Sequence, residues 1–215
     1  LEVRSIQLDY LQELSFDIAV LLNITPDHLD RYQNKMELYT RSKFKIIQKK
    51  TPEQSFIYNK EDANILWGIK QICQTNQEGF YGLEMPKPNE QSDLFTVSNT
   101  TFSMPKRDLP LQGRHNLYNM QVAVLVANLL GMSHAQILKA LPTFVNETHR
   151  LEPVIRLQGV SYINDSKATN VDAVFYALEA MKEAVVWIAG GVDKGNDYSL
   201  LYPLVKEKVT AIVCL

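Results

Sequence analysis

The sequence is poor in the residues that mark several large classes of protein. Its only cysteines, Cys73 and Cys214, lie far apart and without paired spacing, so neither a disulfide framework nor a zinc site is expected. No apolar run approaches the roughly 20 residues of a membrane-spanning helix, and no signal peptide is visible. The formal net charge is -2, and no basic tract with interleaved aromatic residues occurs. We therefore expect a cytoplasmic protein that acts on small molecules, with neither nucleic acid nor a membrane as a partner.

A phosphate-binding loop of the form G-x-x-x-x-G-K-[ST] is also missing, and the glycines at 190–196 do not match it. The 215 residues begin with Leu1 instead of methionine and end inside the apolar run 211–215. Hydrophobic residues make up 46% and charged residues 21% of the chain, as in an ordinary globular protein. We expect a piece of a longer protein, whose phosphate-binding loop, if it uses ATP, precedes Leu1.

The stretch 16–24 is short, nearly continuous in apolar residues and rich in branched side chains. This pattern predicts a strand buried on both faces of a parallel sheet. Thr25 is predicted to cap a following helix that has Pro26 at its first position. Asp27 and His28 would then lie at the carboxyl end of a central strand, where open α/β sheets bind their ligands.

Lys43 occupies an unusual place in the next segment, 34–50, which is predicted to be helical. Apolar residues share one side of this helix, and Lys43 lies in the middle of that stripe. Burial shifts a lysine pKa toward the neutral amine, and only a neutral amine can capture carbon dioxide as a carbamate, an anionic oxygen ligand. The alternative is a packed stem whose ammonium group reaches water. For a lone lysine, periodicity favours that alternative.

The longest helix is predicted at 115–130, ended by Gly131, with a shorter helix at 133–141. Asn116 and Asn119 share one face of the first turn of the helix at 115–130, and their side-chain amides could form hydrogen bonds with the edge of a base. Ordinary capping by asparagine is the alternative. The other expected elements before this helix are a strand at 55–58, a helix at 65–73 and short extended pieces over 74–110.

The pattern changes after residue 148. Strands are predicted at 160–164, 184–189 and 210–215, separated by helices at about 171–182 and 198–208. This β-α-β-α-β order predicts a second domain with a parallel sheet. We therefore expect an α/β protein with a first domain at 1–148 and a second at 149–215.

Two loops of the second domain carry lysines and would follow strands at one sheet edge. The first runs from Asn164 to Asn170 and contains Lys167 and Thr169, and the second contains Lys194. With nearby helix N-termini they would bind carboxylates or phosphates, although each loop alone could be plain strand-to-helix turn chemistry. Arg150 is placed to reach a ligand between the domains, or else is simply a surface arginine.

Taken together, these motifs resemble the Mur ligase family along nearly the whole chain. The matching segments are Asn23 to Arg31, a lysine fifteen residues after His28, Gly113 to Asn119, His149-Arg150 and Asn164 to Asn170. The loop Asn-Asp-Ser-Lys-Ala-Thr-Asn at 164–170 is similar to that of the member which adds D-glutamate. Arg4-Ser5-Ile6 departs from the family, which usually has Ser-Ser-Phe there.

The resemblance implies a role for each matching position. It implies a magnesium site at Glu2, His28 and a carbamylated Lys43, which reverses the preference that periodicity gave for Lys43. It also implies nucleotide contacts by Asn116, Asn119, Arg150 and Asp165, and D-glutamate contacts by Thr169 and Lys194. Lys167 would stabilise the phosphoryl group in transfer, so that Lys43, His28 and Lys167 form the expected catalytic set.

The implied fold is a central ATPase-type domain with a mainly parallel sheet, followed by part of a Rossmann-like C-terminal domain. The implied reaction joins D-glutamate to UDP-N-acetylmuramoyl-L-alanine at the expense of ATP, through an acyl phosphate, in peptidoglycan precursor synthesis. We expect a monomer that needs ATP and magnesium, and a fragment that is inactive on its own. The alternatives are another Mur-type or folylpolyglutamate-type ligase, or an inactive nucleotide-binding module.

Overall fold

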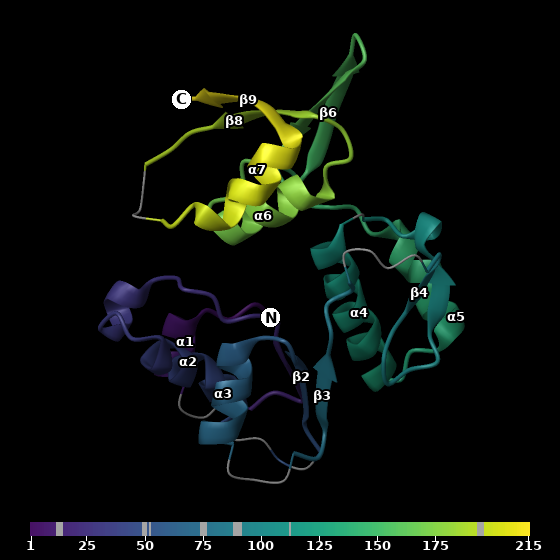
Figure 1. The fold of residues 1–215 in the computed structure, drawn as a ribbon. Helices are drawn as coiled ribbons and strands as arrows, with labels where there is room; N and C mark the ends of the chain where they lie inside the picture. Colours follow the sequence, from purple (N-terminus) through teal and green to yellow (C-terminus); the bar gives the residue numbers. More distant parts are fainter. Residues whose placement is uncertain are drawn as a thin grey trace. The chain divides into compact units, whose positions relative to one another are not determined.

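The computed structural model describes residues 1–11, 15–48, 51, 53–73, 77–87, 92–111, 113–192 and 196–215 (Figure 1). The chain divides into two compact units. The first comprises residues 1–86, 96–103 and 118–134, and the second comprises residues 87–95, 104–117 and 135–215. No helix in these described ranges is long and apolar enough to cross a membrane.

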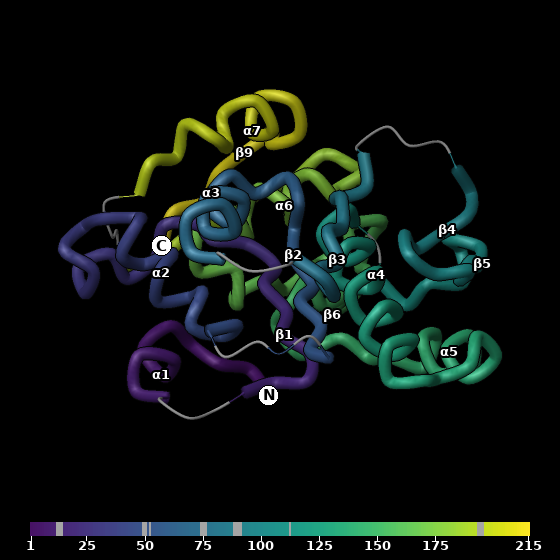
Figure 2. Tube along the Cα trace, turned by 90° about the horizontal axis from the view of Figure 1, so that it is seen from below, coloured from purple at the N-terminus to yellow at the C-terminus, as the bar shows by residue number. Residues whose placement is uncertain are grey.

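The first unit is built on a three-stranded parallel sheet with the strand order β1-β2-β3 (Figure 2). Its strands are β1 (Ile18–Leu21), β2 (Ser55–Asn59) and β3 (Phe80–Leu83). Ala19 and Leu21 on β1 are 3% and 7% exposed, and Phe56 on β2 is fully buried. The strand predicted at 16–24 is thus confirmed in its central part, and the strand predicted at 55–58 is confirmed as β2. Strand β3, which falls among the short extended pieces expected over 74–110, is a member of this sheet.

Helices complete the first unit. They are α1 (Ser5–Tyr10), the 3-10 helix η1 (Leu29–Tyr32), α2 (Met36–Phe44), the 3-10 helix η2 (Lys45–Ile47), α3 (Ala63–Ile72) and, from residue 118 onward, α4 (Arg114–Leu129). The pair α2 and α3 packs closely because Gly68 lies against the ring of Phe44, which a Cβ atom at position 68 would overlap. The helix predicted over 115–130 is confirmed as α4, and Gly131 follows it with a left-handed φ of +80°.

The second unit contains most of the remaining elements. They are the short paired strands β4 (Leu94–Thr96) and β5 (Ser103–Pro105), which straddle the two units, η3 (Lys106–Asp108), α5 (His134–Ala140), η4 (Leu141–Thr143), β6 (Glu152–Leu157), β7 (Val160–Asn164), α6 (Val171–Ala180), β8 (Val185–Ala189), η5 (Ser199–Leu201), α7 (Tyr202–Lys208) and β9 (Val209–Cys214). All three strands and both helices predicted after residue 148 are therefore present. The predicted α/β fold with a parallel sheet is confirmed.

The pairing of β7 differs from the prediction of a single β-α-β-α-β sheet. Strands β8 and β9 are parallel neighbours, but β7 pairs antiparallel with β6, a strand that the sequence analysis missed. Gln158 and Gly159 form the two-residue turn of this hairpin, and both have positive φ, at 49° and 83°. Two successive positive φ values suit a tight hairpin turn, whose twist matches that of the strands. Within the described residues, β7 therefore does not share a ladder with β8.

Candidate functional site

The loop after β1 carries the first group of predicted site residues. It does not form the helix predicted to start at Thr25 and Pro26. Its backbone has no regular structure until η1 begins at Leu29, after His28, which adopts a left-handed φ of 51°. The prediction of a helix here is wrong because long-range hydrogen bonds fix the backbone of the loop in a non-helical conformation. The buried Ile24 donates its N–H to Asp62 Oδ2 and accepts at its carbonyl from Asn64 Nδ2, both at 2.8 Å.

Asp62 also determines where α3 begins. Its Oδ1 accepts hydrogen bonds from the N–H groups of Asn64 and Ile65, both at 2.9 Å, which is the usual role of an N-cap aspartate. The same carboxylate therefore starts α3 and holds the exit of β1, a few residues before Asp27 and His28. The sequence analysis missed this clamp, although Asp62 stands before an apolar helical run and so carried an N-cap signal.

Lys43 is half-buried on α2. Burial lowers the pKa of its ammonium group below 10.5, while Asp27 and Glu2 act in the opposite direction because their carboxylates lie close enough to favour the charged form. The Nζ atom lies 5.4 Å from the ring centroid of Tyr39, a buried member of the core beside it. Lys43 therefore lies against Tyr39 and near two carboxylates from distant parts of the chain.

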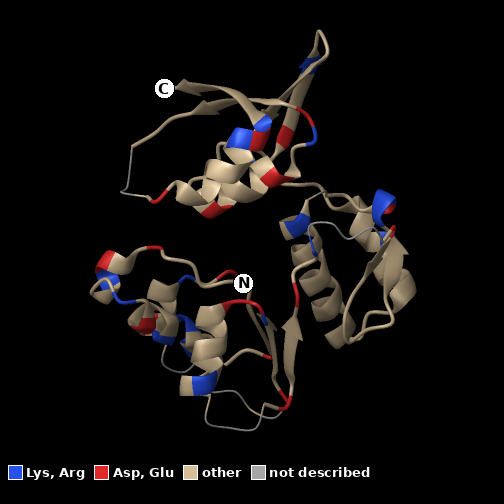
Figure 3. Cartoon of the chain, in the orientation of Figure 1, with Lys and Arg blue, Asp and Glu red and all other residues tan. Residues whose placement is uncertain are grey.

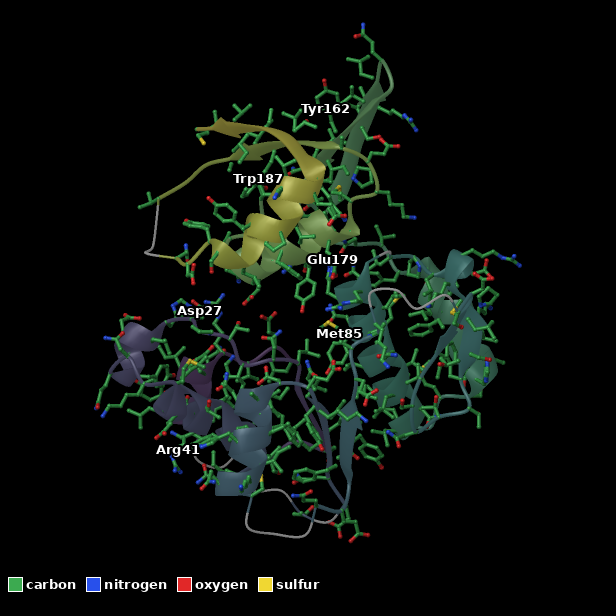
Figure 4. All side chains as sticks on the ribbon, in the orientation of Figure 1. Asp27, Arg41, Met85, Tyr162, Glu179 and Trp187 are labelled. Atoms are coloured by element: carbon green, nitrogen blue, oxygen red, sulfur yellow. The ribbon has the colours of Figure 1, made fainter. Side chains whose placement is uncertain are left out.

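Glu2 and Asp27 thus lie near Lys43, and both are exposed to solvent, as is His28. The His28 side chain is 68% exposed, and its Nε2 is 3.5 Å from Asp27 Oδ2. Figure 4 shows Asp27 on the loop that leads from β1 to η1. The sequence analysis placed Asp27 at this edge but gave it no role as a ligand. Its position beside His28 in the same short motif was the available signal.

The residues around Lys43 fit a magnesium ion in their chemistry. Magnesium prefers oxygen ligands, and the carboxylates of Glu2 and Asp27 supply them. Among the described residues, no three His, Cys, Asp or Glu side chains gather as a ready metal site. A carbamate on Lys43 would add the missing anionic oxygen donor, whereas the His28 imidazole is a less usual partner for magnesium. Acidic and basic side chains are interspersed around α1, α2 and this loop (Figure 3).

In the second unit, the first turn of α4 packs against α6. Arg114 Nε lies 3.5 Å from Glu179 Oε2, and both side chains are 22% exposed. The ring of His115 lies 5.4 Å from that of Tyr176, and burial lowers the pKa of His115. Asn116, the first predicted adenine contact, follows directly and is half-buried, while Asn119 on the same helix is exposed.

The base of the β6–β7 hairpin brings together three other predicted residues. Asp165 Oδ1 accepts a hydrogen bond from the N–H of Leu151 at 2.9 Å. Burial raises the pKa of Asp165, while this hydrogen bond and Arg150 oppose the rise. Arg150 donates from Nε to Glu147 Oε2 at 3.2 Å, and the N–H of Lys167 donates to the carbonyl of His149. The predicted phosphate-binding residues Arg150, Asp165 and Lys167 therefore occupy two segments that are hydrogen-bonded to each other.

The predicted D-glutamate residues are less completely described. Thr169 is exposed and donates its backbone N–H to the carbonyl of Lys167 at 2.9 Å. Lys194 lies outside the described residues. The expectation that the loops 164–170 and 190–196 share the edge of one sheet is not met within the described part of the chain, because β7 and β8 belong to separate ladders.

The chain has clear relatives among known proteins. The model of the Mur ligase middle domain matches residues 1–127. The UDP-N-acetylmuramoylalanine--D-glutamate ligases of Christiangramia forsetii and Cytophaga hutchinsonii are 46% and 42% identical to it over the whole chain, which covers 49% of each. The chain thus spans about half the length of these relatives.

Solved structures with lower sequence identity share the fold. A crystal structure of MurF from Acinetobacter baumannii superimposes with a TM-score of 0.67 at 20% identity, over 92% of this chain and 46% of that one. The ADP complex of MurF ligase from Thermotoga maritima gives a TM-score of 0.62 at 15% identity, over 93% of this chain and 52% of the other. Because the middle-domain model matches more than half of the sequence, this chain belongs to the Mur ligase family.

Proposed function

We propose that the full-length protein joins D-glutamate to UDP-N-acetylmuramoyl-L-alanine, using ATP, in the synthesis of peptidoglycan precursors. The observation that carries this proposal is the identity of 46% and 42%, over every part of this chain, to two ligases named for that reaction. The loop Asn164 to Asn170, which resembles the D-glutamate-adding branch of the family, supports the same substrate.

In the proposed reaction, the terminal carboxylate of the alanyl nucleotide attacks the γ-phosphorus of ATP and releases ADP. The amine of D-glutamate, arriving as the free base, then attacks the acyl phosphate, an amide bond forms and phosphate leaves. Both the carboxylate and the triphosphate are anionic, so the protein must mainly neutralise charge and hold the reactants in place. Lys167 would stabilise the phosphoryl group during transfer.

Magnesium would be held by Glu2, His28 and a carbamate on Lys43, with Asp27 as a further candidate ligand. The bound ion would supply charge neutralisation at the phosphate oxygens. Two features support this assignment: Lys43 is half-buried, and both candidate carboxylates, those of Glu2 and Asp27, interact with its charge. Burial favours the neutral amine that carbon dioxide requires, and the carboxylates would remain as oxygen ligands once the carbamate had formed.

The remaining roles follow the family positions. Asn116 and Asn119 would contact adenine, and Arg150 with Asp165 would lie at the nucleotide. Thr169 and Lys194 would orient D-glutamate. Residues 1–148 would form the later part of the central ATP-binding domain, and residues 149–215 the first part of the Rossmann-like domain. We further propose that the protein works in the cytoplasm as a monomer on small-molecule substrates.

The substrate assignment is tested by phosphate release from the full-length protein with ATP, magnesium and the alanyl nucleotide, across a panel of amino acids. D-glutamate alone should stimulate release. Stimulation by another amino acid with the same nucleotide, or by L-glutamate with a folate, would replace the proposal with a different ligase. No release under any condition would favour an inactive nucleotide-binding module.

The carbamate is tested by adding ¹³C-bicarbonate to the full-length protein and recording ¹³C NMR spectra. The wild type should show a carbamate resonance that is absent from Lys43→Ala. The same variant should lose ligase activity and regain part of it with short carboxylic acids that fill the ligand gap. Full activity of Lys43→Ala without any additive would exclude the metal-binding role.

A further inference from the structure

A polar network lies where α1, η1 and α2 meet, and none of its members is a proposed metal ligand. Asp9, in the last turn of α1, accepts at Oδ2 from the Tyr32 hydroxyl at 3.0 Å. Its Oδ1 accepts from Ser42 Oγ and from Lys45 Nζ, both at 2.9 Å. Ser42 Oγ is also 3.1 Å from the carbonyl oxygen of Ser5 and 3.2 Å from the Tyr32 hydroxyl, so its single proton is shared among acceptors.

The members of this network come from the three elements next to the proposed ligands. Helix α1, which carries Asp9, begins three residues after Glu2. The 3-10 helix η1 begins directly after His28 and ends with Tyr32. On α2, Ser42 is the immediate neighbour of Lys43. A single carboxylate therefore connects the three chain segments that deliver the proposed magnesium ligands.

The network lies beside an apolar core that already holds these elements together. Tyr32 is 8% exposed and its ring lies 5.2 Å from that of Tyr39, while Ser42 is 3% exposed. Asp9 is more accessible, with a side-chain exposure of 32%. Apolar packing tolerates small shifts between elements, whereas hydrogen bonds restrict both distance and angle. The polar contacts thus add a geometric restraint that burial of rings alone does not supply.

We propose that Asp9 is a positioning residue, which through Tyr32 and Ser42 fixes the relative placement of Glu2, His28 and Lys43 and so determines the affinity of this site for a divalent cation. This inference rests on the proposed magnesium site. Asp9 itself does not bind the ion. Partners hydrogen-bonded directly to a metal ligand typically contribute about 10- to 100-fold to metal affinity, and Asp9 acts one step farther out, so we expect an effect at the lower end of that range.

The test uses Mn²⁺ as the probe, titrated into the full-length protein and followed by electron paramagnetic resonance. Tyr32→Phe removes only the hydroxyl and keeps the buried ring, so the variant should fold, and Asp9→Asn removes the charge with little change in shape. Each should raise the Mn²⁺ dissociation constant about tenfold. The double variant should be little worse than either single one, because both changes disrupt the same unit.

Arg41→Gln is the matched control on the same helix. Arg41 lies over the ring of Trp67 on α3, 5.5 Å from its centroid, and Figure 4 places it on the side of α2 away from Asp27. This variant should bind Mn²⁺ as the wild type does. Thermal unfolding of all variants separates a loss of placement from a general loss of stability, and Asp9→Glu should restore part of the affinity.

The Mn²⁺ titration distinguishes failure of the positioning role from failure of the metal site itself. If Lys43→Ala weakens Mn²⁺ binding while Asp9→Asn and Tyr32→Phe stay within twofold of the wild type, Asp9 has no positioning role and the metal site stands. If Lys43→Ala and Glu2→Gln also leave Mn²⁺ binding unchanged, the proposed metal site is wrong, and the inference fails with it. Ligase assays give a second readout, since the half-saturating magnesium concentration should rise in the Asp9 and Tyr32 variants while the rate at saturating magnesium is kept.

Discussion

Lys208 gives the sharpest stability prediction in the second unit. Its Nζ atom donates to three backbone carbonyls at the end of α6, those of Leu178 at 3.1 Å, Glu179 at 2.7 Å and Met181 at 2.8 Å. The last carbonyls of a helix have no partner within the helix, and a cation there also interacts favourably with the helix dipole. One ammonium group on α7 therefore caps the neighbouring helix.

The Lys208→Met variant keeps the apolar stem and removes the cap. A hydrogen bond to a charged group contributes about 1.5–3 kcal/mol, and the three bonds share one partly exposed ammonium, so we expect a total loss of about 2 kcal/mol. Such a loss corresponds to roughly thirtyfold faster exchange of amide protons that open with this unit. Hydrogen exchange of the α6 amides in the full-length protein measures it.

Lys206→Met is the control, because it makes the same substitution in the last turn of the same helix at an exposed position. It should change exchange in α6 by less than twofold. Equal effects of the two variants, or no effect of either, would refute the capping role of Lys208.

Two further predictions concern the first unit. Gly68→Ala should destabilise the protein by about 1–3 kcal/mol in denaturant unfolding, although alanine is the better helix former, because its Cβ atom would overlap the ring of Phe44. Stability equal to the wild type would mean that Phe44 moves aside freely. Burial acts to raise the pKa of Asp9, but hydrogen bonds from Lys45, Ser42 and Tyr32 outweigh it and hold this pKa below 3.8. The network should therefore stabilise the fold above about pH 4 and lose this contribution as the pH falls through the lowered pKa, so the difference in unfolding free energy between wild type and Asp9→Asn should shrink in acid. A difference that stays constant down to pH 2 would contradict this.

Local patterns in the sequence predicted much of the fold. The strand at β7 and the helix at α4 were predicted to within a residue or two at either end, because alternating or periodic apolar residues end at clear turn and cap signals such as Gly131. Strand β6 was missed because Pro153 interrupts it, yet Gln158-Gly159 between two apolar runs is a hairpin signal. The domain boundary near residue 148 stays a prediction.

Less of the candidate site could be predicted from the sequence. Spacing along α2 singled out Lys43, but its proximity to Glu2 and Asp27 depends on contacts between segments far apart in the chain. The same is true of the hydrogen bonds that hold Ile24, because their side-chain partners Asp62 and Asn64 come from the start of α3. These long-range contacts override the local preference of Thr25 and Pro26 for a helix start. The assigned roles of the site residues stay predictions.

The two kinds of strand pairing imply an order of folding. The β6–β7 hairpin joins neighbouring residues through a two-residue turn, and hairpins of this kind form within microseconds. In the parallel ladder, Ile18 must find Ser55 and Phe56 must find Phe80 across long intervening segments, which costs more loop entropy and slows folding. We therefore expect the hairpin that carries Asp165 at its base to form before the parallel sheet whose first strand leads into the loop of Asp27 and His28.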